Sequence, residues 1–155
     1  MAEILSENIK TKEILDWQGI HLLHFSGSSC SQKLRIFLNY KGIKWQSHSI
    51  SIATGQNYSN WFLGINPKGL VPVLVDDGKV IAESNDIIQY LEQKFPKPVL
   101  ISKEHEDSMA DHLKDEDDLH IDIRNIAYKY MFGGLGTKKS NNLECFEMHE
   151  GNTDE

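Results

Sequence analysis

The chain has 155 residues, a formal net charge of −7, and hydrophobic and charged fractions of 39% and 25%. This length allows one ordinary domain with part of another, and it excludes two complete large domains. The negative charge disfavours a nucleic-acid partner, because such affinity depends largely on clustered Lys and Arg side chains. No apolar run approaches the roughly 18 residues that a membrane helix needs, so no membrane partner is expected.

Cysteine is scarce, and the two thiols, Cys30 and Cys145, imply no disulfide framework. Their scarcity favours a reducing compartment. Residues 1–18 mix charged residues with single apolar ones and lack the continuous apolar core of a secretory signal. We therefore expect a cytoplasmic protein, and we interpret residues 1–18 as an extension that no sequence pattern fixes to a core.

From residue 19 onward, the pattern predicts two strand-helix units. Residues 20–25 form a short apolar strand that ends in a serine-rich loop, and apolar residues at helical spacing then predict a helix that stops near Gly42. Residues 45–52 predict a second strand. Aromatic and apolar residues at helical spacing within 54–66 predict a second helix.

A hairpin and a closing helix follow. The β-branched run at 70–75, an Asp-Gly turn and the short run at 79–82 are typical of two antiparallel strands. A helix capped by Ser84 or Asn85 comes next and is stopped by prolines. The order βαβαββα over residues 19–101 predicts an α/β domain with the thioredoxin-like fold.

The rest of the chain predicts one long helix and a polar tail. Residues 102–134 carry apolar residues at helical spacing and end in paired glycines. Residues 135–155 are polar, have no clear period and are predicted to be disordered.

Three motifs occur in order at the ends of the predicted strands. They are Ser28-Ser29-Cys30-Ser31, Asn66-Pro67-Lys68-Gly69-Leu70-Val71-Pro72-Val73-Leu74, and Glu83-Ser84-Asn85. Each is weak alone, but together they resemble the glutathione transferase family, most closely its zeta class and related bacterial enzymes. The long helix resembles the first helix of the family's second, all-α domain, so a truncated form of that domain is expected.

The resemblance implies that Ser28, with Ser29 as second candidate, stabilises the glutathione thiolate. Unpaired amide groups and the helix dipole at the start of the first helix favour a thiolate there, and a hydroxyl donor stabilises it further. The structural alternative is that these serines only cap the helix.

The resemblance further implies that glutathione contacts Ser28, Gln56, Val71, Pro72, Glu83 and Ser84. Pro72 matches a cis-proline of the family, which lets the backbone of Val71 pair with the cysteinyl part of glutathione. Glu83 and Ser84 match the residues that hold the charged γ-glutamyl end. Gln56 matches a polar contact to the glycyl end.

Cys30 is the candidate for a redox role. It falls on the apolar stripe of the first predicted helix, and the position that cysteine-type relatives use matches Ser28 instead. A buried structural cysteine is therefore favoured, with a glutathione-dependent thiol oxidoreductase working through Cys30 as the alternative.

A metal site on the long helix is a further alternative. Its candidate ligands are His105, His112, Glu116 and His120. The HExxH motif is absent, so a solvated charged face is favoured and no metal cofactor is expected.

The sequence as a whole favours a glutathione transferase, in which the thiolate of glutathione, bound as a substrate, attacks an electrophilic small molecule. The main alternative is a non-catalytic relative that binds glutathione or a partner, since most of the second domain is not expected. A homodimer remains possible by the same resemblance.

Overall fold

The computed structural model describes residues 3–100 and 102–126. The predicted tail, residues 135–155, and the end of the long predicted helix lie outside the described residues. Within the described part, no helix combines the length and the apolar character needed to cross a membrane. The division of the chain at residues 18, 101 and 134 stays a prediction.

One five-stranded mixed sheet forms the centre of the molecule. Its strands are β1 (Glu3–Ile4), β2 (Ile20–His24), β3 (Trp45–Ser49), β4 (Val73–Asp76) and β5 (Lys79–Ile81). They lie in the order β1-β5-β4-β2-β3. The β2 and β3 strands are parallel, whereas the other neighbours are antiparallel.

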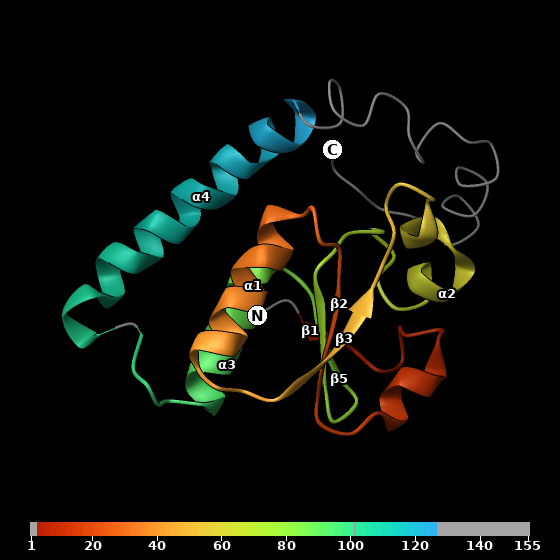
Figure 1. Cartoon of the computed structure of the whole chain (residues 1–155), viewed down its shortest axis with the longest axis horizontal. Helices are drawn as coiled ribbons and strands as arrows, with labels where there is room; N and C mark the ends of the chain where they lie inside the picture. The colour runs from red at the N-terminus through yellow and green to blue at the C-terminus, as the bar shows by residue number, and fades with distance from the viewer. Residues whose placement is uncertain (1–2, 101, 127–155) are drawn as a thin grey trace.

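The helices connect these strands in the predicted order. They are α1 (Ser29–Tyr40), α2 (Asn60–Leu63), α3 (Ser84–Lys94) and α4 (Glu106–Ile126), with 3-10 helices η1 (Lys12–Asp16), η2 (Gln56–Tyr58) and η3 (Lys103–His105). From β2 to α3 the order is βαβαββα, which confirms the thioredoxin-like fold. The α4 helix lies outside α1 and α3, on the side away from the sheet (Figure 1).

Each face of the sheet is covered by its own apolar core. Because side chains alternate along a strand, Leu22 packs toward α1 and α3, whereas the next residue, Leu23, packs toward α2 and η1. Both side chains are fully buried. This two-sided burial explains why β2 and β4 appear in the sequence as nearly continuous apolar runs.

Two helix boundaries differ from the sequence prediction. The helical segment expected within 54–66 begins only after Gly55, which adopts the left-handed conformation at φ +75°. It is divided into η2 and α2 at Ser59, because the extended backbone of Ser59 ends η2 and its side chain caps α2. The cap of α3 is Glu83, at φ +63°, so the expected caps Ser84 and Asn85 are instead residues of the first helical turn.

The amino-terminal segment is attached to the core, contrary to the expectation that nothing fixes it. The β1 strand pairs with β5, and Ile9 and Ile14 are 1% and 0% exposed in the core beneath α2. The Thr11 hydroxyl donates a hydrogen bond of 2.7 Å to the carbonyl of Trp61. The apolar residues of this segment show no period in the sequence, so their burial could not be predicted. It depends on contacts with residues far along the chain.

This attachment predicts a stability effect at Ile14. Replacing Ile14 by Ala should lower the free energy of unfolding by about 2–5 kcal/mol, because a fully buried side chain leaves a cavity. Leu5→Ala is the matched control, since Leu5 is 55% exposed, and it should change stability by no more than about 0.5 kcal/mol. Denaturant unfolding measures both, and equal small effects would show that the segment contributes nothing to the core.

Candidate functional site

A cleft opens where the first turn of α1, the loop before β4, the start of α3 and the carboxy-terminal half of α4 meet. Its lining includes four residues that the resemblance assigned to glutathione, Val71, Pro72, Glu83 and Ser84. Cys30 lines the cleft from α1. The α4 helix contributes Asp117, His120, Ile121 and Arg124. The enclosed space is about 190 Å³, below the roughly 300–1,000 Å³ of common ligand pockets, so a peptide-sized ligand would extend outside it.

The loop before β4 is held rigidly by two side-chain amides. Asn66 donates to the carbonyl of Leu70, and the buried Asn57 donates to the carbonyl of Gly69, both at 2.9 Å. The Val71–Pro72 peptide bond is cis, as the resemblance implied. The β4 ladder begins at Val73, so the backbone of Val71 lies outside the sheet pairing and borders the cleft.

The turn from β5 into α3 brings a carboxylate and a hydroxyl to the cleft. Glu83 is half exposed, and its Oε1 lies 3.0 Å from Nζ of Lys68. Ser84 is buried at the first position of the 11-residue helix α3. The free amide groups and the dipole of such a helix end favour a negatively charged ligand group.

Three of the sequence candidates do not line the cleft. Ser28 caps α1 by accepting a hydrogen bond of 3.2 Å from the amide of Ser31, and Ser29 is exposed beside it. Gln56 is exposed, and its Oε1 accepts from the amide of Ser51 at 2.9 Å. The Ser28 hydroxyl still carries a hydrogen that it can donate, because a hydroxyl donates and accepts at once.

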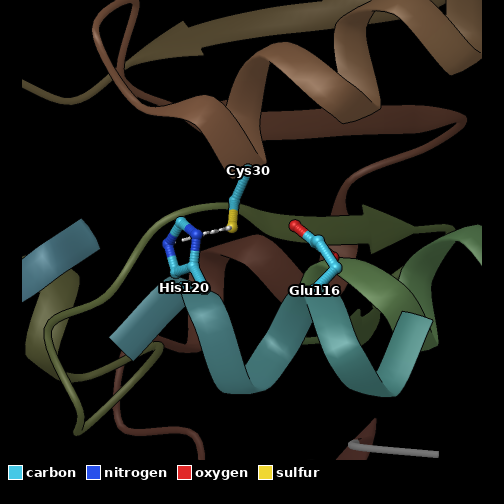
Figure 2. A group of neighbouring side chains, drawn as sticks. All are labelled: Cys30, Glu116 and His120. Carbon is cyan, nitrogen blue, oxygen red and sulfur yellow. Dashed lines mark hydrogen bonds between the residues drawn. The ribbon is translucent and has the colours of Figure 1, made fainter. Parts of the chain in front are cut away.

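Cys30 faces the cleft, so the sequence interpretation that placed it in the apolar core was wrong. The side chain is half buried, and Sγ lies 3.3 Å from Nε2 of His120 (Figure 2). Burial raises the pKa of the Cys30 thiol, and the Ser84 hydroxyl and the Lys33 ammonium offset this only in part. The cysteine is therefore a protonated thiol near neutral pH.

The imidazole beside Cys30 is neutral at the same pH. Burial lowers the pKa of His120, and the positive charge of Arg124 lowers it further. A neutral ring has one nitrogen that accepts a hydrogen bond, so the Cys30 thiol can donate to it. The two side chains thus form a neutral thiol-imidazole pair, not a thiolate-imidazolium ion pair.

A polar network attaches α4 to the domain at this point. Nζ of Lys33 donates to Oε2 of Glu116 and to Oδ1 of Asn85, each at 2.6 Å. Asn85 is buried and donates to Asp117 Oδ1 at 2.9 Å. Burial alone would raise the pKa of Glu116, but the hydrogen bonds from Lys33 and Asn85 outweigh it and hold the pKa below its usual value.

The sequence analysis missed that α4 completes the cleft. Asp117, His120 and Arg124 carried no motif, although the four-residue interval between Glu116 and His120 was visible and places both on one helix face. Spacing along the chain could not predict that this helix face contacts Cys30, because Cys30 and His120 are 90 positions apart.

Residues 27–94 match the family model of the glutathione S-transferase N-terminal domain. Two curated relatives are the zeta-class glutathione S-transferase of Euphorbia esula, 40% identical over 87 residues, and the maleylacetoacetate isomerase of Pseudomonas aeruginosa, 38% identical over 80 residues. These matches cover 56% and 50% of this chain, and 39% and 38% of the relatives. The chain thus spans about two fifths of the length of these relatives.

Solved structures that are similar to this chain include further glutathione transferases and a β-etherase. The β-etherase LigF from Sphingobium sp. strain SYK-6 has a TM-score of 0.73 and 29% identity, over 85% of this chain and 56% of that one. Human glutathione transferase theta-2 was solved in complex with glutathione and an unknown ligand. It has a TM-score of 0.50 and 32% identity, over 52% of this chain and 33% of that one. The thioredoxin-like part of this chain, over residues 27–94, is thus of the glutathione S-transferase N-terminal domain type.

Proposed function

We propose that the chain is a glutathione transferase that binds glutathione in this cleft and activates its thiol for attack on an electrophilic small molecule. The observation that supports this most is the meeting of Val71-Pro72 and Glu83-Ser84 on one cleft beside the start of α1. The names of the relatives, a zeta-class transferase, an isomerase and a β-etherase, support enzymatic chemistry of this class.

The cleft suits the two ends and the middle of glutathione in different ways. The amide groups at the start of α3 and the Ser84 hydroxyl would hold the γ-glutamyl carboxylate, and the Glu83 carboxylate would hold its ammonium group. The backbone of Val71, which borders the cleft outside the sheet ladder, would pair with the cysteinyl residue like an added strand. Gln56 stays a candidate for the glycyl end, and its exposure leaves its amide accessible.

Activation of the thiol would then fall to the start of α1. The glutathione thiol releases its proton to solvent, and the Ser28 hydroxyl donates a hydrogen bond to the thiolate, with Ser29 as the second candidate. The positive end of the α1 dipole lowers the energy of the same anion. The thiolate sulfur then forms a bond to an electrophilic carbon, either by addition or with departure of a leaving group.

A thiol oxidoreductase working through Cys30 is the second candidate function. It is favoured by the position of Cys30, which lines the cleft beside His120. It is disfavoured by the raised pKa of the Cys30 thiol, because the thiolate is the reactive form and little of it exists near neutral pH.

If glutathione binds in this cleft, calorimetric titration with reduced glutathione should show one binding site per chain. Ser84→Ala should weaken binding by about tenfold or more, because a hydrogen bond to a charged group contributes ~1.5–3 kcal/mol. The control is Ser108→Ala, an exposed serine of α4, which should bind as the wild type does. A folded wild type that gives no heat of binding would contradict the proposal, and binding without turnover of any electrophile would favour the non-catalytic module.

If Ser28 stabilises the glutathione thiolate, Ser28→Ala should lose transferase activity and Cys30→Ala should keep it. With an activated aryl halide as the electrophile, Ser28→Ala should lower kcat/KM by about 10²-fold, as expected for a lost donor to a developing or bound anion. Ser28→Thr keeps a hydroxyl at the cap and should retain most activity. Cys30→Ala should retain this conjugation activity. The oxidoreductase alternative predicts instead a glutathione-dependent reduction of a disulfide substrate that is lost in Cys30→Ala and survives in Ser28→Ala.

A further inference from the structure

Three side chains with metal-binding atoms converge between α1 and α4. Cys30 comes from the first turn of α1, and Glu116 and His120 come from one face of α4, at positions i and i+4 (Figure 2). One ligand atom of each lies within 4.8 Å of the others, and all three side chains are partly buried. The two other histidines considered as ligands, His105 at the end of η3 and His112 of α4, are exposed.

We propose that Cys30, Glu116 and His120 form a binding site for a divalent ion of the zinc type. Thiolate, imidazole and carboxylate are the protein ligands that Zn²⁺ takes, and three of them with one open position are typical of its accessible sites. Zinc bonds of about 2.3 Å to sulfur and 2.0–2.1 Å to nitrogen in a tetrahedron place these two atoms roughly 3.5 Å apart. The observed separation of Sγ and Nε2 is 3.3 Å, so little rearrangement is needed.

The local charges are compatible with such an ion. On binding, the Cys30 proton leaves to solvent, and the thiolate and the Glu116 carboxylate then balance the two positive charges. Lys33 opposes the ion, since its Nζ lies 2.6 Å from Oε2 of Glu116. A carboxylate has two oxygens, so one can bind the metal while the other keeps the ammonium, and Lys33 retains its bond of 2.6 Å to Asn85.

The open fourth position would face the cleft. Cys30 and His120 both line the cleft, together with Val71 and Ser84. The ion would therefore link α4 to α1 and stand at the wall of the proposed glutathione site. The metal site itself does not depend on the proposed function, because its three ligands all belong to this chain and are already close together.

The test uses the full chain and Co²⁺ alone, a spectroscopic substitute for zinc, in the absence of glutathione. One equivalent should bind and give the near-ultraviolet absorption of a thiolate-cobalt bond, and added Zn²⁺ should abolish this absorption. Cys30→Ser should remove the thiolate band, whereas Cys145→Ser should keep it. Glu116→Gln and His120→Gln should each weaken cobalt binding by at least about tenfold.

The matched control is His112→Gln, since His112 is an exposed histidine on the same helix, and it should leave the affinity unchanged. The proposal is overturned if wild-type protein gives no thiolate band, if Cys145→Ser rather than Cys30→Ser removes it, or if His112→Gln weakens binding as much as His120→Gln. Circular dichroism of each variant verifies that the fold is retained, and because three independent ligands are tested, one misfolded variant does not decide the outcome.

Discussion

The position of α4, and with it one wall of the cleft, depends on the buried amide of Asn85. Its nitrogen lies within hydrogen-bond distance of the Leu113 carbonyl, Glu116 Oε2 and Asp117 Oδ1, and its oxygen accepts from Lys33. Leaving such a group buried and unpaired costs about 1–3 kcal/mol, so the amide disfavours a helix shifted along its axis. The register that satisfies Asn85 is the one that brings His120, one turn later, against Cys30.

The cleft formed in this way contains charges of both signs at short distances. Lys68 pairs with Glu83 at its edge, and Lys33 pairs with Glu116 behind it. Alternating charges of this kind suit a zwitterionic ligand better than a simple anion, because each ligand charge finds an opposite partner. They also keep Glu116 ionised, which a carboxylate must be in order to bind either a cation or an ammonium group.

The core of the domain was predictable because its signals are local. The Asp-Gly turn fixes the hairpin of β4 and β5, and the apolar runs of β2 and β4 indicate strands that are covered on both faces. The errors occurred where tertiary contacts decide. Ser59 divides an expected helix, and Ile9 and Ile14 attach an amino-terminal segment that has no hydrophobic period. Cys30 contacts His120 of α4 instead of packing in the apolar core.

The sequence by itself determined the thioredoxin-like order of strands and helices, since this order follows from hydrophobic period and turn chemistry. The resemblance of its short motifs to a known family singled out Val71, Pro72, Glu83 and Ser84, which line one cleft. Only the tertiary structure decided that Cys30, Glu116 and His120 lie together. The physical reason is that α4 is amphipathic only weakly and is held by polar contacts to α1 and α3. Such contacts depend on the direction of individual side chains, and the spacing of residues along the chain does not predict that direction.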